Sequence, residues 1–97
     1  MRKLEPVHPG EILEQEFMQP FGLSSNALAR AIGVTPARVN EIVRGRRGIT
    51  ADTALRLARY FGTDAQSWMN LQDDYDLKVA EREAGDAIRA IHPMRAA

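Results

Sequence analysis

The stretch SSNALARAIGVTPARVNEIVRGRRGIT, residues 24–50, contains the start and stop signals of two short helices that follow one another closely. Gly33 can adopt the positive φ that ends the first helix, and Thr35 can cap the start of the second. Pro36 then falls in the first turn, where proline has no hydrogen bond to lose, and Gly45 ends the second helix. The sequence therefore predicts two helices joined by a turn of about three residues.

Each of these two helices has one apolar face. Ser24 or Ser25 can cap the first helix. The apolar positions recur at helical spacing, as Leu28, Ala29 and Ile32 in the first helix and Val39, Ile42 and Val43 in the second. Helices joined by so short a turn usually cross steeply, with a small residue such as Ala29 at the contact. This pattern is typical of a helix-turn-helix, which places its second helix in the major groove of DNA, but a helical hairpin inside a bundle would carry the same signals.

The distribution of charge favours the DNA-binding interpretation. Residues 24–61 carry seven arginines against two acidic residues, a net charge of +5, whereas residues 1–23 carry −2 and residues 62–97 carry −3. The formal net charge of zero therefore conceals a basic middle. Clustered arginines neutralise phosphates and supply the sequence-independent part of DNA affinity, and their planar guanidinium groups also suit guanine.

Length and composition limit the class of protein. Ninety-seven residues, 44% of them apolar, predict one domain with a modest core and no deep catalytic cavity. The chain has no cysteine, no signal-peptide pattern and no run long enough to span a membrane. His8 and His92 lie far apart without metal-ligand spacing, and the acids at 73, 74 and 76 lack the pattern of a calcium loop. We therefore expect a cytoplasmic protein that is not an enzyme and has no cofactor or metal.

Three more helices are predicted around the central pair. Their expected limits are Pro9 to Pro20, Thr50 to Gly62, and Asp64 to about Gly85. Their expected inward residues include Leu13 and Phe17, then Ala54, Leu57, Ala58 and Phe61, then Trp68, Leu71, Tyr75 and Val79. Five helices without a strand pattern predict an all-α domain over residues 9–85. An N-terminal extension is expected at 1–8 and a flexible C-terminal tail at 86–97.

Four segments carry a resemblance to a known family. They are HPGEIL (residues 8–13), LARAIGVTPARVNEIVRGRRGIT (28–50), ALRLARYFGT (54–63) and WMNLQDDYDL (68–77). Together they resemble the HigA group of antitoxins, also called the VapI type, within the Xre-type, lambda-repressor-like family of bacterial regulators. The helix-turn-helix alone indicates only the broad family, whereas HPGEIL combined with W-x-N-L-Q-x-x-Y-D-L is specific to this group. The resemblance implies a five-helix, lambda-repressor-like DNA-binding domain.

The resemblance also implies which residues touch DNA, because such domains use the start of the first motif helix and the exposed side of the second. The positions concerned here are Ser25, Thr35, Ala37, Arg38, Asn40, Glu41, Arg44, Arg46 and Arg47. Ser25 is expected to contact phosphate or the first base pair, and Thr35 to bind phosphate. The arginines that follow the second helix are expected to bind the DNA backbone. Arg38 is expected to read guanine, with Glu41 either accepting from cytosine or supporting Arg38.

The function implied by the resemblance is a sequence-specific repressor of its own toxin-antitoxin operon. Its expected partners are double-stranded operator DNA, a second copy of the chain in a homodimer, and a HigB-like toxin that resembles RelE-type mRNA endonucleases. A solitary regulator without a toxin is one alternative. A protein-interaction module that has lost DNA binding is another, although the basic motif argues against it. Either the N-terminal helix or the helix from Trp68 to Val79 could form the dimer interface.

Overall fold

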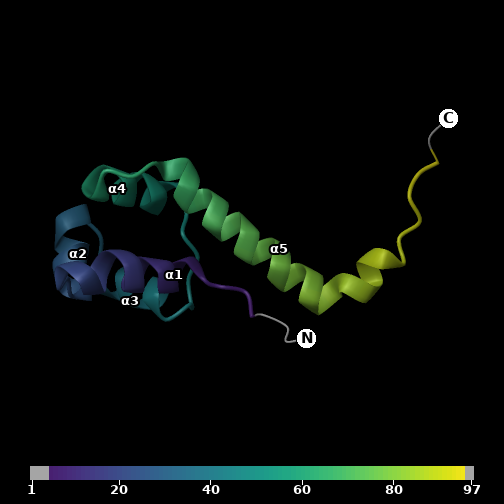
Figure 1. Cartoon of the computed structure of the whole chain (residues 1–97), viewed down its shortest axis with the longest axis horizontal. Helices are drawn as coiled ribbons and strands as arrows, with labels where there is room; N and C mark the ends of the chain where they lie inside the picture. Colours follow the sequence, from purple (N-terminus) through teal and green to yellow (C-terminus); the bar gives the residue numbers. More distant parts are fainter. Residues whose placement is uncertain (1–4, 96–97) are drawn as a thin grey trace.

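The computed structural model describes residues 5–95, and this part of the chain is helical without a strand (Figure 1). Its elements are α1 (Pro9–Ile12), the π-helix η1 (Leu13–Met18), the 3-10 helix η2 (Gln19–Phe21), α2 (Ser25–Ile32), α3 (Pro36–Val43), α4 (Ala51–Phe61) and α5 (Ala65–Arg89). The predicted all-α class is confirmed. Within residues 5–95, no helix is both long enough and apolar enough to cross a membrane.

Side-chain caps fix the starts of α2, α3 and α4. Ser24 Oγ accepts a hydrogen bond from the Ala27 N–H (3.0 Å), so Ser24 and not Ser25 is the cap of α2. Thr35 Oγ1 accepts from the Arg38 N–H (3.1 Å), as the sequence predicts. Thr50 caps α4 in the same way. Each such cap contributes about 1 kcal/mol, so these three short helices have well-defined first turns.

The N-terminal helical region ends later than expected. Helical structure continues through Pro20 to Phe21, and Gly22 ends it with a φ of 65°. The expectation that Pro20 ends the helix was wrong because Pro20 lies in the first turn of η2, where the missing N–H removes no hydrogen bond.

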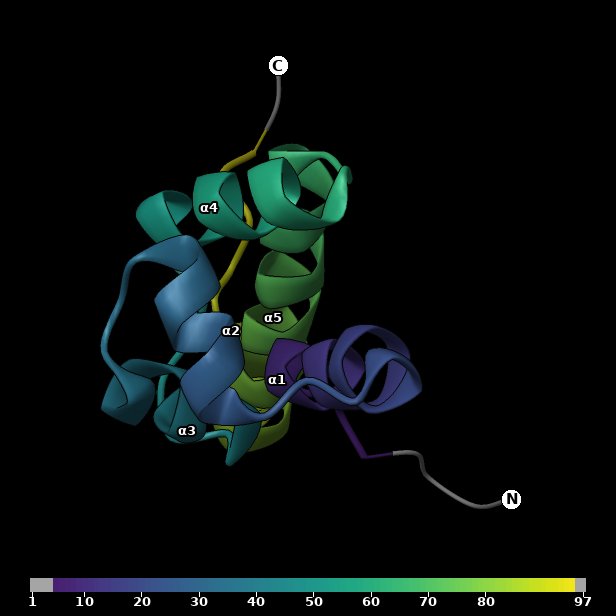
Figure 2. The ribbon, with the colours of Figure 1, turned by 90° about the vertical axis from the view of Figure 1, so that its left-hand side faces the viewer.

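The core lies where α1, η1, α2, α3, α4 and the start of α5 converge (Figure 2). Its buried apolar side chains are Leu13, Met18, Leu28, Ala29, Ile32, Val39, Ile42, Ile49, Ala54, Leu57 and Trp68. The predicted inward faces of α2, α3 and α4 are therefore confirmed. Phe17 extends this core, because its ring lies 5.0 Å from that of Trp68 and 5.1 Å from that of Phe61 between centroids.

The buried face of α5 differs from the prediction at one position. Leu71 is exposed, and Gln72 is buried in its place. Gln72 Oε1 accepts a hydrogen bond from the Ile49 N–H (2.7 Å), and its Nε2 donates to Asp76 Oδ1 (2.9 Å). A polar side chain belongs inside here because the linker between α3 and α4 presents a buried N–H that no helix satisfies.

The far half of α5 extends away from the other helices (Figure 1). The helix runs past the expected end at Gly85 to Arg89, whose guanidinium forms ion pairs with Glu81 and Asp86. A basic residue in the last turn also suits the helix dipole, so the weak apolar periodicity of this segment was a poor guide to its end.

The N-terminal segment lies along α5 before α1 begins. Glu5 pairs with Arg82 of α5 (2.6 Å), and the ring of His8 meets that of Tyr75 edge-on at 4.8 Å between centroids. His8 also caps α1, because its Nδ1 accepts from the Gly10 N–H (2.9 Å). The remainder of the expected extension, residues 1–4, and the last two residues of the expected tail, 96–97, lie outside the described residues.

Candidate nucleic-acid interface

Helices α2 and α3 pack closely against each other (Figure 2). Ala29, the small residue expected at their contact, is buried. Gly33 ends α2 with a φ of 75°, a left-handed conformation that disfavours residues with a Cβ. Val34 then donates its N–H to the Ala29 carbonyl (3.0 Å), and the chain turns directly into α3. This is the geometry of a helix-turn-helix motif.

The start of α3 presents polar backbone and hydroxyl groups to solvent. Thr35, Pro36 and Ala37 are all exposed. The Thr35 hydroxyl accepts from the Arg38 N–H, which leaves its own proton available for an incoming acceptor. Unpaired N–H groups and the positive end of the helix dipole also point outward at this terminus. Ser25, at the first position of α2, is half-buried.

Arg38 forms an ion pair with Asp52, a residue that the sequence did not indicate as part of the site. Its Nη1 lies 3.2 Å from Oδ2 of Asp52 in the first turn of α4, and one third of the Arg38 side chain is exposed (33%). The same oxygen accepts from Nε of Arg56 at 2.9 Å. These hydrogen bonds, led by that from Arg56, hold the pKa of Asp52 below its ordinary value. The carboxylate therefore stays charged near neutral pH.

Within the described residues, the side chain of Glu41 pairs with Arg47 and forms no ion pair with Arg38. Glu41 Oε1 accepts from Arg47 Nε (2.8 Å). Its backbone carbonyl also accepts from the N–H groups of Arg46 (2.8 Å) and Arg47 (3.2 Å). The expectation that Glu41 supports Arg38 is thus not met, because Asp52 pairs with Arg38 instead. Through these bonds to Arg46 and Arg47, Glu41 holds the basic turn that follows α3 against the end of the helix.

The rest of the expected site lies on one side of α3 and the turn that follows it. Asn40 is half-buried, while Arg44, Arg46 and Arg47 are exposed. Across the described part of the chain, Arg44 and Arg46 form no ion pair, so both cations are available to a ligand. The structure brings the expected residues of α3 and its turn together and leaves their contacts with DNA a prediction.

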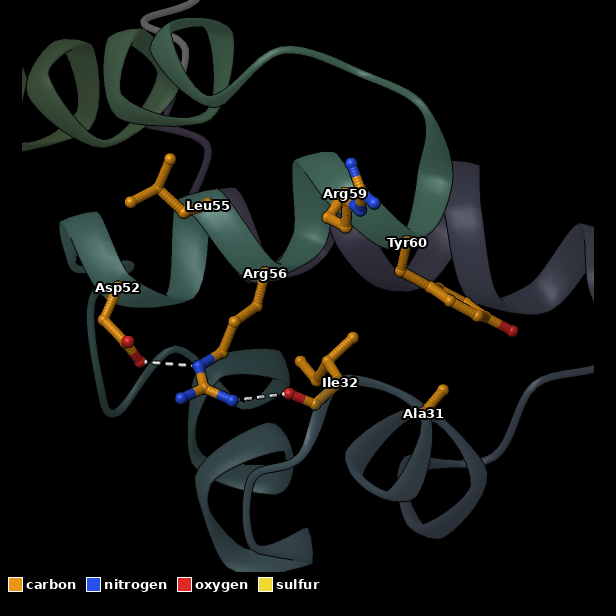
Figure 3. A pocket seen from close by; sticks show the side chains of 7 residues that line it. All are labelled: Ala31, Ile32, Asp52, Leu55, Arg56, Arg59 and Tyr60. Atoms are coloured by element: carbon orange, nitrogen blue, oxygen red, sulfur yellow. Dashed lines mark hydrogen bonds and ion pairs between the residues drawn. The ribbon is translucent and has the colours of Figure 1, made fainter.

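Two residues of this region, Asp52 and Arg56, were missed by sequence reasoning. Arg56 Nη1 donates to the carbonyl oxygens of Ile32 (2.7 Å) and Gly33 (3.2 Å) at the end of α2 (Figure 3). The spacing of Asp52 and Arg56 by four residues does predict an ion pair on one helix. Nothing in the spacing predicts that this pair reaches both α2 and Arg38.

Known proteins with similar sequences and structures support this description. A family model described as Helix-turn-helix matches residues 15–68, which is more than half of the chain. Virulence-associated protein I of Dichelobacter nodosus is 59% identical over 92 residues, covering 95% of this chain and 84% of that relative. Antitoxin HigA-1 of Vibrio cholerae is 34% identical, and the match covers 95% of this chain and 87% of that relative.

A solved structure agrees over almost the whole molecule. The Pseudomonas aeruginosa antitoxin HigA with the higBA promoter matches with a TM-score of 0.90 at 52% identity, covering 94% of this chain and 100% of that chain. The packed α2–α3 pair and the matching family model define a helix-turn-helix protein of the Xre type. Within that class, the chain belongs to the HigA group of antitoxins.

Proposed function

We propose that this protein is a sequence-specific DNA-binding antitoxin that represses its own operon. The observation that carries the proposal is the basic surface formed by α3 and its following turn, where Arg44 and Arg46 lack an ion pair among residues 5–95. The likeness to an antitoxin HigA solved with promoter DNA adds support. A surface of this kind neutralises phosphates while the exposed side of α3 enters the major groove.

Each predicted contact has a physical role in the proposal. The N-terminus of α3 holds a phosphate through Thr35 and the adjacent backbone, and Ser25 does so at the start of α2. Ala37, Asn40 and Glu41 lie along the side of α3 that faces base edges. Arg44, Arg46 and Arg47 hold the DNA backbone. Arg38 reads guanine through O6 and N7, so it supplies most of the discrimination.

Binding to the DNA just upstream of the gene tests this function. Fluorescence anisotropy at several salt concentrations should show tighter binding to that duplex than to a scrambled duplex of the same composition. Arg38→Ala should cost about 1 to 3 kcal/mol on the upstream duplex only. Arg46→Ala should weaken binding to both duplexes and reduce the slope of log affinity against log salt by about one.

The matched control for these variants is Arg95→Ala, which removes one exposed arginine outside the motif. It should leave both affinities nearly unchanged. Equal binding of the wild-type protein to the upstream and scrambled duplexes would contradict the operator function. Absence of binding to either duplex would favour the protein-interaction alternative.

We propose further that the protein acts as a homodimer joined through α5. An exposed apolar stripe runs at helical spacing along the half of α5 that leaves the domain, formed by Leu77, Ala80, Ala84 and Ile88. Leu77 is 71% exposed and Ile88 is 47% exposed, and residues this apolar are normally covered. Two copies related by a two-fold axis would bury this stripe and present two α3 helices to one duplex.

Sedimentation analysis of surface variants tests the interface. Leu77→Glu should convert the dimer to a monomer with an unchanged helical circular dichroism spectrum, because Leu77 makes no core contact. Leu55→Glu, at an exposed leucine of α4 (63%), is the control and should leave the dimer intact. Loss of the dimer in Leu55→Glu alone would move the interface to α4.

The antitoxin role implies a toxin partner, which we propose to be a HigB-like protein encoded beside this gene. The support for it is the family and the relative named Antitoxin HigA-1. Co-expression of the two genes and purification through a tag on the neighbouring protein should yield a stable complex. Absence of a complex together with intact operator binding would favour the solitary regulator.

A further inference from the structure

Three segments of the helix-turn-helix region meet at one carboxylate and one guanidinium. Asp52 in the first turn of α4 accepts from Arg56 Nε at 2.9 Å and from Arg38 Nη1 at 3.2 Å, both through Oδ2. Arg56 in turn donates from Nη1 to the carbonyl oxygens of Ile32 and Gly33. Figure 3 shows Arg56 reaching from α4 toward the end of α2, with Asp52 on the same side. The end of α2, the start of α3 and α4 are thereby connected.

Arg56 has a clear local task in this network. The last carbonyl groups of a helix have no partner within the helix, and a guanidinium can satisfy them. A positive charge also suits the negative end of the helix dipole. Arg56 thus secures the end of α2, next to the turn at Gly33, and at the same time fixes the orientation of the Asp52 carboxylate.

The ion pair with Asp52 limits how freely the Arg38 side chain can move. An arginine side chain has several rotatable bonds, and on a basic surface facing DNA it can turn toward the nearest phosphate. A phosphate contact carries no sequence information, whereas a contact with a base edge does. A carboxylate that accepts from one end of the guanidinium restrains the side chain and leaves its other N–H groups free to donate to a base.

We propose that Asp52 is a positioning residue for DNA readout: it holds the guanidinium of Arg38 over the exposed side of α3, and Arg56 holds Asp52. This inference rests on the proposed operator binding and on base contact by Arg38. Asp52 is more than half exposed, with 58% of its side chain accessible, so its ion pairs contribute little to folding stability. Replacing Asp52 is therefore expected to change how strongly the protein discriminates between DNA sequences.

Positioning and structural support predict different results for Asp52→Asn. The asparagine removes a negative charge close to the DNA, so affinity for the scrambled duplex should stay the same or rise. The ratio of operator affinity to scrambled-duplex affinity should fall by about tenfold, because the restrained base contact of Arg38 is lost in part. A residue that only supported the fold would lower both affinities when replaced.

The test is a double-mutant cycle with Arg38→Ala, Asp52→Asn and the combined variant on the upstream and scrambled duplexes at one salt concentration. In the Arg38→Ala background, Asp52→Asn should cause no further loss of discrimination. The matched control is Asp74→Asn, which removes one exposed aspartate of α5 and its ion pair with Lys78. It should not change discrimination in either background.

Two outcomes would overturn the proposal. In the first, Asp52→Asn tightens operator binding with full discrimination, which would mean that Asp52 merely withholds Arg38 from DNA. In the second, Asp52→Asn reduces discrimination equally with and without Arg38. Both outcomes require a wild-type protein that prefers its upstream duplex, so they are distinguishable from a failure of the operator function, in which the wild-type protein shows no preference.

Discussion

Gly10 in α1 lies directly against Ile42 in α3. A Cβ atom at position 10 would come within 1.8 Å of the Ile42 carbonyl oxygen, a distance that real atoms do not tolerate. The glycine of the HPGEIL segment is therefore required by close packing of α1 onto the back of α3. Ile42 is a buried residue in the last turn of α3, so α1 packs against the inner part of the helix that is proposed to enter DNA.

We expect Gly10→Ala to destabilise the protein by about 3 kcal/mol, because the two backbones must separate to admit the methyl group. Urea unfolding followed by circular dichroism measures this. The control is Gly22→Ala, which places a methyl group at a φ of +65° with nothing within 4 Å. That variant should lose only about 1 kcal/mol, from backbone strain alone. Equal losses in the two variants would contradict the close-packing explanation.

Folding stability should depend on the protonation of His8. Burial lowers the pKa of His8 below its ordinary value of 6.5, an effect that the nearby charge of Asp76 opposes. The unfolded chain therefore binds more protons than the folded protein just below pH 6.5. The stabilising contribution of neutral His8 is present above that pH and is lost as the pH falls through it toward the lower folded-state pKa.

The matched variant is His8→Asn, because asparagine is a good helix cap that does not titrate in this range. Urea unfolding at several values between about pH 5 and pH 8 compares the two proteins. The wild-type protein should lose more stability than His8→Asn as the pH falls. Parallel curves for the two proteins would show that His8 does not contribute.

Gln72 is expected to be important for stability although it is polar. Gln72→Met keeps a similar volume but leaves the buried N–H of Ile49 without its acceptor, at a cost of about 1 to 3 kcal/mol. Gln66→Met is the control, because Gln66 is exposed on the same helix and its side chain donates to Asn70 Oδ1 and not to a buried backbone group. Thermal unfolding should separate the two variants. Similar melting temperatures would contradict the role assigned to the Gln72 amide.

Two alternative roles of Glu41 predict opposite effects of Glu41→Gln on DNA affinity. If Glu41 only restrains Arg47, Glu41→Gln releases a cation and removes a negative charge, so affinity for every duplex should rise. The slope of log affinity against log salt should steepen by up to about one. If Glu41 instead accepts from cytosine, the same change should weaken binding to the operator alone. Anisotropy titrations on the two duplexes distinguish these results.

Local signals in the sequence were sufficient for most of the fold. Ser24, Thr35 and Thr50 cap their helices in the structure because capping depends on residues only a few positions apart. The apolar face of α4 was equally readable. Leu71 was placed wrongly because helical spacing does not reveal that a linker elsewhere in the chain needs a hydrogen-bond acceptor.

The sequence predicted the backbone of the candidate site better than it predicted the side-chain contacts there. The position of Arg38 on α3 follows from the caps that define that helix. Its partner Asp52 lies 14 residues away, and their contact depends on how α4 crosses the start of α3. Such a pairing results from tertiary packing, which the spacing of residues along one helix does not predict.

Trp68 provides an intrinsic fluorescence probe of folding. It is the single tryptophan of the chain, it is buried, and its indole N–H donates to Thr63 Oγ1 at 2.9 Å. Its ring also lies at a tilt against that of Phe17, and because the indole is buried, its fluorescence emission should shift to longer wavelength when α5 leaves the core. The indole lies in the core and not on α3, so its emission should report unfolding and change little when α3 binds DNA.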